Sequence, residues 1–207
     1  MDTAFWWSFL FSFGVSACCG VRAGLSLLGV SLLAHLGWLF LHPAFSFMAD
    51  WRFIALVVLA AVLEIIIDKF RASSNILDGC GVVLRTVVAL WITAALIGGD
   101  IWSVWVIGGI VLGGLTTFVV NLAKPMVRAW TTDLVPNHTF RGTLAVSIFE
   151  DIAIGLALVG VIYWPWLGLA YGILALLVGL TVLGLFVRQG GSPLHWHWNR
   201  VGGREIN

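Results

Sequence analysis

The sequence predicts an all-α, polytopic membrane protein with about six transmembrane helices and a short N-terminal half-helix. Of its 207 residues, 60% are hydrophobic and 10% are charged, whereas soluble domains contain about 25% charged residues. Apolar runs long enough to cross a bilayer recur along the chain. The period-two alternation that is typical of transmembrane barrels does not occur in the sequence. Helical spans therefore explain the composition best.

The chain is expected to form one transmembrane domain over residues 1–190. Residues 191–207 would form a tryptophan-rich tail at the cytoplasmic face or the membrane interface. Six apolar stretches match the roughly 20 residues that a helix needs to cross a bilayer. These predicted spans cover residues 21–41, 52–69, 80–98, 101–121, 143–164 and 167–187.

Ahead of the first span, residues 4–17 (AFWWSFLFSFGVSA) are apolar but short for a crossing. Joined to the first span, they would make a helix about 60 Å long, which is twice the hydrocarbon thickness. The intervening CCGVRAG, residues 18–24, therefore predicts a break. Two arrangements are open: a half-helix that dips in from the cytoplasm or lies along the interface, or a seventh, short span that places the N-terminus outside.

Glycine and proline mark the fourth span. Glycine pairs at 108–109 and 113–114 allow close approach of a neighbouring helix, and internal glycines recur in the sixth span. Pro125, in NLAKPMVR, is expected to end or bend the fourth span. The bases beside it, Lys124 and Arg128, are expected to anchor the chain at the cytoplasmic surface. Attraction of anionic lipid or of an anionic substrate is the alternative role.

Basic residues and tryptophans indicate the same orientation. The connections on one side of the predicted spans collect most of the lysines and arginines, whereas the other side has only Arg52. By the positive-inside rule, the basic side is cytoplasmic, and both termini are expected there. The opposite ends of the spans carry tryptophans that would form an aromatic belt: Trp38, Trp51, Trp102, Trp105, Trp164 and Trp166.

Charged residues inside the predicted spans are the most informative feature, because each costs several kcal/mol in lipid unless it is paired or hydrated. At a rise of about 1.5 Å per residue, they all fall within roughly 12 Å of the inner surface. Similar depth on several helices predicts one shared polar cluster. Its expected members are Arg22, Glu64, Asp68, Arg85, Glu150 and Asp151.

Two interpretations of this cluster are open. A static network of ion pairs would fix the register of the helices. A water-accessible site would instead bind a proton or a cation. The count of charges supports the second interpretation, because three acids (Glu64, Glu150 and Asp151) face two arginines, Arg22 and Arg85. One carboxylate would then lack a fixed cation, and such a group holds a proton or binds a mobile cation.

Other chemistry receives little support. A net charge of +1 does not favour nucleic acid as a partner. The sequence has no nucleophile elbow, phosphate loop, HExxH or CxxC motif, so we do not expect an enzyme. No cofactor is predicted, and the identity of any metal is left open. In the tail, LHWHW could hold a metal through its histidines, but Trp196 and Trp198 favour an interfacial aromatic segment.

Five short motifs together resemble a known family. SACCGVRAGLSLLGVSLLAHLG, LEIIIDK, LDGCGVVLRTVVAL, NLAKPMVRA and SIFEDIAIGLAL follow one another between about Ser16 and Pro165. In this order they resemble the bacterial membrane family named domain of unknown function 4126. The resemblance implies a fold but no established activity. It places the polar positions of the family at Arg22, Glu64, Asp68, Lys69, Asp78, Arg85, Lys124, Glu150 and Asp151.

These observations favour a small secondary transporter or channel in a bacterial inner membrane. It would carry a proton, a cation, or a small solute coupled to one, with the intramembrane carboxylates as ligands. The alternative is a non-transporting accessory subunit that packs against a larger membrane complex or contacts pigment or lipid. The expected partners are the bilayer and either further copies of the chain or a larger membrane complex.

Overall fold

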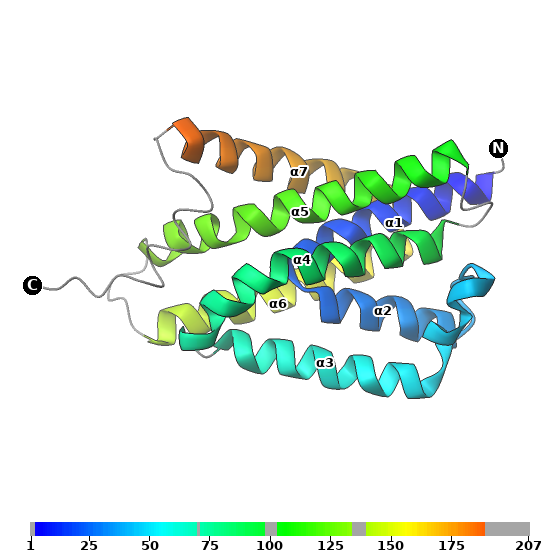
Figure 1. The fold of residues 1–207 in the computed structure, drawn as a ribbon, viewed down its shortest axis with the longest axis horizontal. Coiled ribbons are helices and arrows are strands. Elements are labelled where there is room, and N and C mark those ends of the chain that lie inside the picture. Colours follow the sequence, from blue (N-terminus) through cyan, green and yellow to red (C-terminus); the bar gives the residue numbers. More distant parts are fainter. Residues whose placement is uncertain (1–2, 70, 98–102, 134–139, 189–207) are drawn as a thin grey trace, which may run out of the picture.

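The computed structural model describes residues 3–69, 71–97, 103–133 and 140–188. Its regular elements are all helices, and the described residues contain no strand, as the sequence predicts. Figure 1 shows the helices packed side by side along one long axis. They are α1 (Thr3–Val21), α2 (Ala23–His35), the short 3-10 helix η1 (Pro43–Ala49), α3 (Trp51–Lys69), α4 (Arg71–Leu96), α5 (Val104–Asp133), α6 (Phe140–Tyr163) and α7 (Pro165–Arg188).

Helix α1 is the centre of the bundle. Every residue from 10 to 20 is buried, and α1 packs against α4, α5, α6 and α7. A helix that is apolar on all sides is typical of a protein core or a membrane span, and the packing of α1 against α4, α5, α6 and α7 places it in the core. The helix comes closest to α7 at Gly14, where an added Cβ would lie 2.4 Å from the Cα of Gly168.

The chain reverses between α1 and α2. Arg22 separates the two helices with extended backbone angles, φ −142° and ψ 94°. Residues 3–35 therefore form a re-entrant hairpin whose tip lies near the middle of the bundle (Figure 1). The break predicted within residues 18–24 is confirmed.

Helix α2 ends earlier than predicted. It stops at His35, so it is about 20 Å long and falls short of the bilayer thickness. The cause is a glycine C-cap: Gly37 has φ +72°, its N–H donates to Ala34 O, and the Trp38 N–H donates to Leu33 O. This pair of bonds is a Schellman motif. The predicted first span, 21–41, is therefore wrong as one continuous helix.

The remaining five helices are long and alternate in direction. The regions between them differ from the predicted boundaries, since α4 begins at Arg71 and α5 extends to Asp133. Pro125 therefore does not end α5, although the proline lacks an N–H for the bond to the carbonyl four residues earlier. As a result, Lys124 lies within a helix instead of after one.

The two ends of the described chain lie at opposite ends of the bundle. Helix α1 runs parallel to α7. Near the start of both helices, Trp7 stacks edge-on against Trp166 at a centroid distance of 5.8 Å. Thr3 and Arg188 are therefore far apart (Figure 1). The side of the membrane that each terminus faces stays a prediction. The hairpin returns the chain to its starting end, and five long helices then follow, so α1 begins and α7 ends at opposite ends of the bundle.

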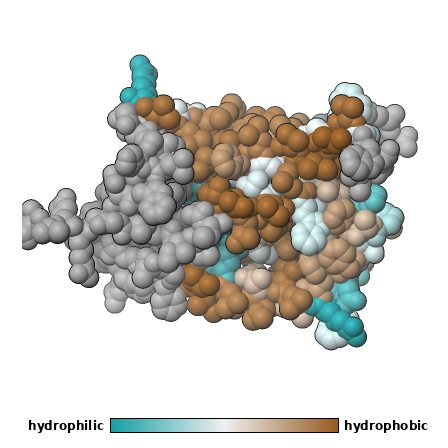
Figure 2. Space-filling model, in the orientation of Figure 1, coloured by the Kyte–Doolittle hydropathy of each residue, from teal (hydrophilic) through white to brown (hydrophobic). Residues whose placement is uncertain are grey.

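The outer surface of the bundle is strongly apolar. Large hydrophobic side chains project outward from α3, α6 and α7, with Leu56 66%, Phe149 73% and Leu174 60% exposed. Figure 2 shows hydrophobic side chains over most of the described part of one face, with most hydrophilic atoms toward the ends. By length and composition, two described segments could cross a membrane: Val104–Lys124 and Pro165–Leu185. Membrane crossing by the other helices stays a prediction.

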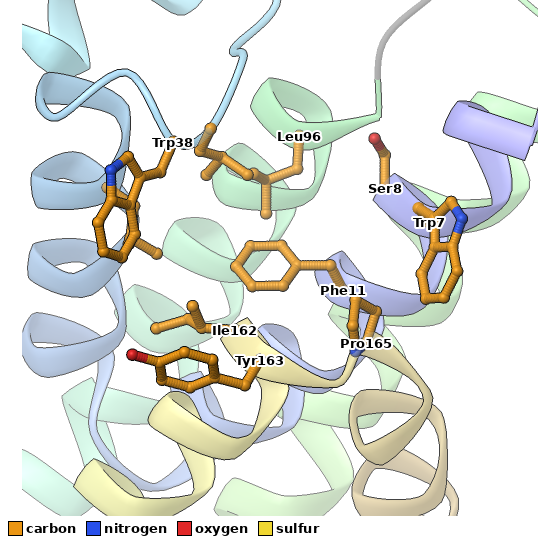
Figure 3. Close-up of a pocket in the computed structure, with 10 residues that line it drawn as sticks. Trp7, Ser8, Phe11, Trp38, Leu96, Ile162, Tyr163 and Pro165 are labelled. Carbon is orange, nitrogen blue, oxygen red and sulfur yellow. The ribbon is translucent and has the colours of Figure 1, made fainter.

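A pocket of about 360 Å³ opens at the end of the bundle where α6 ends and α7 begins. Phe11 and Leu96 lie among the aromatic and aliphatic side chains that line this pocket (Figure 3). The tip of the re-entrant hairpin lies elsewhere, deeper in the bundle, and its surroundings are polar.

Candidate functional site

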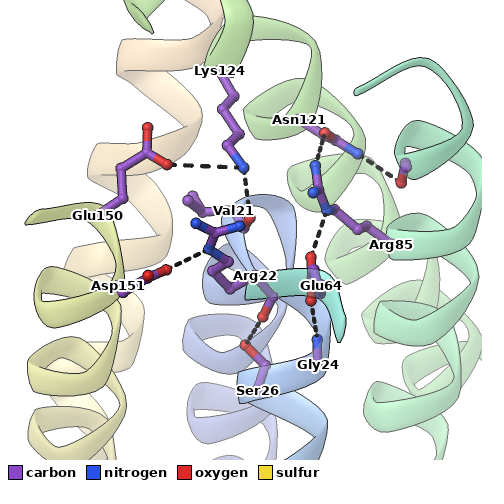
Figure 4. A network of polar contacts seen from close by, with 11 residues as sticks. Val21, Arg22, Gly24, Ser26, Glu64, Arg85, Asn121, Lys124, Glu150 and Asp151 are labelled. Atoms are coloured by element: carbon purple, nitrogen blue, oxygen red, sulfur yellow. Dashed lines mark hydrogen bonds and ion pairs between the residues drawn. The ribbon is translucent and has the colours of Figure 1, made fainter. Parts of the chain in front are cut away.

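Charged side chains from α3, α4, α5 and α6 converge on the tip of the re-entrant hairpin (Figure 4). We call this group the tip cluster. Its described members are Arg22, Glu64, Arg85, Asn121, Lys124, Glu150 and Asp151.

Arg22 occupies the tip itself. Its Nε donates to the Asp151 carboxylate on α6 at 2.6 Å, and its side chain has no exposed surface. The Arg22 carbonyl accepts a bond of 2.9 Å from the Ser26 hydroxyl. Arg22, the non-helical residue between α1 and α2, is therefore held through both its side chain and its backbone. We call the end of α1 and the start of α2 the two half-helix ends.

Glu64 of α3 caps the start of α2. One of its oxygens accepts a 2.8 Å bond from the Gly24 N–H, and the other accepts a 3.2 Å bond from Arg85 Nε. The start of a helix carries a partial positive charge and N–H groups that lack helical partners, so a carboxylate there is stabilising. A Cβ on Gly24 would lie 2.9 Å from Glu64 Oε2, which explains why glycine suits this close contact.

Lys124 of α5 caps the end of α1. Its ammonium donates to the Val21 carbonyl at 3.0 Å and lies 3.9 Å from Glu150 Oε2. The end of a helix carries a partial negative charge, so a cation is favourable there. The two half-helix ends thus receive charges of the signs that their dipoles require.

Arg85 connects α3, α4 and α5. Besides Glu64, it donates through Nη1 to the Asn121 side-chain oxygen at 3.0 Å. The Asn121 amide nitrogen in turn donates to the Gly81 carbonyl at 3.0 Å. Asn121 therefore fixes the orientation of the Arg85 guanidinium.

Burial divides the tip cluster by charge sign. The side chains of the three cations are 0–3% exposed, whereas those of the three carboxylates are 14–18% exposed. Buried cations are tolerable only because anions and carbonyls surround them. The carboxylates therefore form the more exposed side of the cluster.

Asp151 is near the midpoint of α6, roughly 17 Å from either end of the helix at about 1.5 Å per residue. The helices α4 and α6 start earlier than the predicted spans, and the depth of about 12 Å below the inner membrane surface stays a prediction.

The structure brings together five of the predicted site residues: Arg22, Glu64, Arg85, Glu150 and Asp151. What they bind stays a prediction. The predicted surplus of carboxylates is wrong for the described side chains, because Lys124 joins the cluster and three cations then balance three acids. The side chains of Asp68 and Arg128, and the whole of Trp196 and Trp198, lie outside the described part of the structure.

Sequence reasoning missed two members and two backbone groups of the cluster. Lys124 is predicted as a surface anchor, although the family resemblance places it among the polar positions, and Asn121 receives no role. A polar NLAK segment ahead of a proline is a signal that could have identified them, because a helix continuing through Pro125 buries both side chains. The Val21 carbonyl and the Gly24 N–H follow from the predicted break, since broken helix ends expose such groups.

Metal binding receives no support from the described residues, among which no group of three His, Cys, Asp or Glu side chains could hold an ion. Cys18 and Cys19 are both buried and reduced. The histidines of the LHWHW tail lie outside the described residues.

Comparison with known proteins gives one match. No curated protein and no solved structure matches the chain. A family model described as "Domain of unknown function (DUF4126)" matches residues 9–186, which covers the re-entrant hairpin from residue 9 onward and every member of the tip cluster. The chain therefore belongs to the DUF4126 family.

Proposed function

We propose that the protein is an integral membrane transporter or channel that carries a proton or small cation, alone or coupled to a small solute. The observation that carries this proposal is the meeting of two half-helix ends with six charged side chains in the interior of the bundle. Broken helices of this kind are typical of secondary transporters, in which the helix ends form the binding site.

The membrane placement is supported by the outer surface. Exposed apolar side chains cover the long helices, and exposed tryptophans gather at one end of the bundle, among them Trp38, Trp51, Trp105, Trp164 and Trp166. The opposite end holds Lys69, Arg71 and Arg188 at helix termini. By the positive-inside rule, this basic end faces the cytoplasm, and α1 starts outside. A bacterial inner membrane is the location that we propose.

Glu150 is the carboxylate best suited to exchange a proton or cation. It has the largest exposed fraction of the three described acids, 18%, and its contact with Lys124 is the longest of the ion pairs that the structure describes here, at 3.9 Å. Loss of its charge would weaken the attraction on Lys124, which also holds the end of α1. Ion binding at Glu150 is thereby coupled to the position of the hairpin.

Flux measurements on purified protein in liposomes test the proposal. An imposed pH gradient with an internal pH-sensitive dye, or a cation gradient with a matching dye, should give flux for the wild type and none for Glu150→Gln. Asp50→Asn is the matched control, since Asp50 is an exposed acid at the far end of the bundle, and its amide can still accept the Arg52 N–H. Equal flux through wild type and Glu150→Gln would reject the proposal.

A second function, that of a non-transporting accessory subunit, is favoured by one observation. Each described carboxylate of the tip cluster already lies within ion-pair distance of a cation, as in a static brace. The brace would hold the hairpin while the apolar outer faces pack against a partner. Co-purification of a stable membrane partner, together with no flux of any ion tested, would support this alternative.

A further inference from the structure

The pocket at the tryptophan-bearing end of the bundle is a second site, separate from the tip cluster. Its floor is made by Phe11 and Leu96, which are 7% and 2% exposed. Its rim is made by Trp7, Trp38 and Tyr163, which are 44–68% exposed. Figure 3 shows these side chains around one space between α1, α6 and the chain that follows α2.

The pocket does not lead to the tip cluster. Along α6, Leu158 and Ile154 lie between the pocket residue Ile162 and Asp151, and they are 9% and 2% exposed. Val15 of α1 lies at the same level and is 1% exposed. These three side chains belong to one packed core. A ligand in the pocket would therefore be held at the bundle end and would not approach the carboxylates.

The chemistry of the pocket selects an apolar ligand. None of its ten lining residues carries a charge, and among their side chains only Ser8 and the aromatic polar groups offer hydrogen bonds. A volume of about 360 Å³ is within the usual range for small-molecule sites, roughly 300–1,000 Å³. An anionic or cationic headgroup would find no counter-charge inside it.

The mouth of the pocket is continuous with the apolar outer surface. Leu36, Val159 and Tyr163 are 50–66% exposed and lie on the chain segments that form the rim or lead to it. In a membrane, these side chains would contact lipid at the depth where exposed tryptophans mark the interface. The apolar ligand most abundant at such a mouth is a lipid chain.

We propose that this pocket holds one acyl chain of a phospholipid from the outer leaflet, with its headgroup at the rim formed by Trp38 and Tyr163. Amphipathic aromatic rings such as these favour the boundary between acyl chain and headgroup. The bound chain would fill the space between the hairpin and α6. This inference rests on the membrane placement proposed above and not on transport.

Native mass spectrometry of the detergent-purified full chain tests this site. The wild type should retain one phospholipid. Ile162→Trp, which fills the pocket, should retain at least about tenfold less, while Leu156→Trp, on the exposed side of α6, should match the wild type. If Ile162→Trp does not fold, Leu39→Trp fills the pocket from the other wall.

Three outcomes would overturn the assignment: no retained phospholipid in the wild type, equal retention in the filled and control variants, or a retained ligand that is not a phospholipid. Flux through Ile162→Trp in liposomes separates this inference from the proposed function. Lost lipid with intact flux supports the lipid site and leaves transport standing. Retained lipid with no flux in the wild type would reject transport alone.

Discussion

Removal of the Lys124 ammonium is the sharpest test of the tip cluster. Lys124→Met keeps much of the buried aliphatic stem but deletes the 3.0 Å bond to the Val21 carbonyl and the contact with Glu150. Removing one partner of a buried ion pair costs about 3–5 kcal/mol. Since the Glu150 side chain is 18% exposed, water can solvate it in part, and we take the lower limit. The expected loss of unfolding free energy is about 3 kcal/mol.

A loss of this size should lower the melting temperature in detergent by about 6–12 °C, since 1 kcal/mol shifts a chain of about 200 residues by about 2–4 °C. Arg52→Met is the matched control, because Arg52 is an exposed cation at the bundle end, and such changes alter stability by about 0.5 kcal/mol or less. The double variant Lys124→Met/Glu150→Gln should lose less than the sum of the two single losses, because both substitutions remove the same contact. Equal melting temperatures for Lys124→Met and Arg52→Met, or strictly additive losses in the double variant, would refute the assigned contacts.

Three further predictions follow from the packing and the topology. Gly14→Ala should lower the free energy of unfolding by about 1–3 kcal/mol in a thermal unfolding assay, because the new methyl group meets the Gly168 backbone at 2.4 Å. The control Gly108→Ala should be neutral or stabilising, since a Cβ added there meets nothing within 4 Å. A greater loss of stability in Gly108→Ala than in Gly14→Ala would refute the α1–α7 contact. In a Cys80→Ser background, Cys18 and Cys19, both 0% exposed, should resist maleimide in the folded protein and react after unfolding, whereas rapid labelling of the folded protein would contradict their burial. Reporter tags at the two termini should lie on opposite sides of the membrane, and tags on the same side would reject the proposed topology.

The sequence predicts that a tip cluster exists, but it predicts only some of the residues that form it. Intramembrane charges must find partners, so the convergence of Arg22, Glu64, Arg85 and Asp151 follows from energetics alone. The inward position of Lys124 is a weaker inference, carried only by the polar NLAK segment and by the family resemblance. Its sequence position beside Pro125 is typical of a helix end, and only the continuation of α5 to Asp133 brings its ammonium inward.

The direction of the hairpin was also beyond sequence reasoning. Residues 4–17 are apolar on all sides, and such a segment packs equally well whichever end it enters from. The positive-inside rule reads charges in connections, and this segment has none. The end of α2 was easier to predict from the sequence, because a glycine two residues beyond His35 is a common helix-stop signal. That signal alone shortens the first predicted span to a half-helix.

The three acids of the tip cluster do not have equal roles. Glu64 neutralises Arg85 and caps the start of α2, so the fold depends on its charge at two contacts. Glu150 touches neither half-helix end directly in the described contacts, and its ion pair with Lys124 is the longest. Glu64→Gln should therefore lower the melting temperature by several degrees more than Glu150→Gln, while Glu150→Gln should have the larger effect on flux relative to its effect on stability. If Glu150→Gln were the more destabilising variant, its carboxylate would be a structural brace, and the assignment of Glu150 as the exchanging acid would be withdrawn.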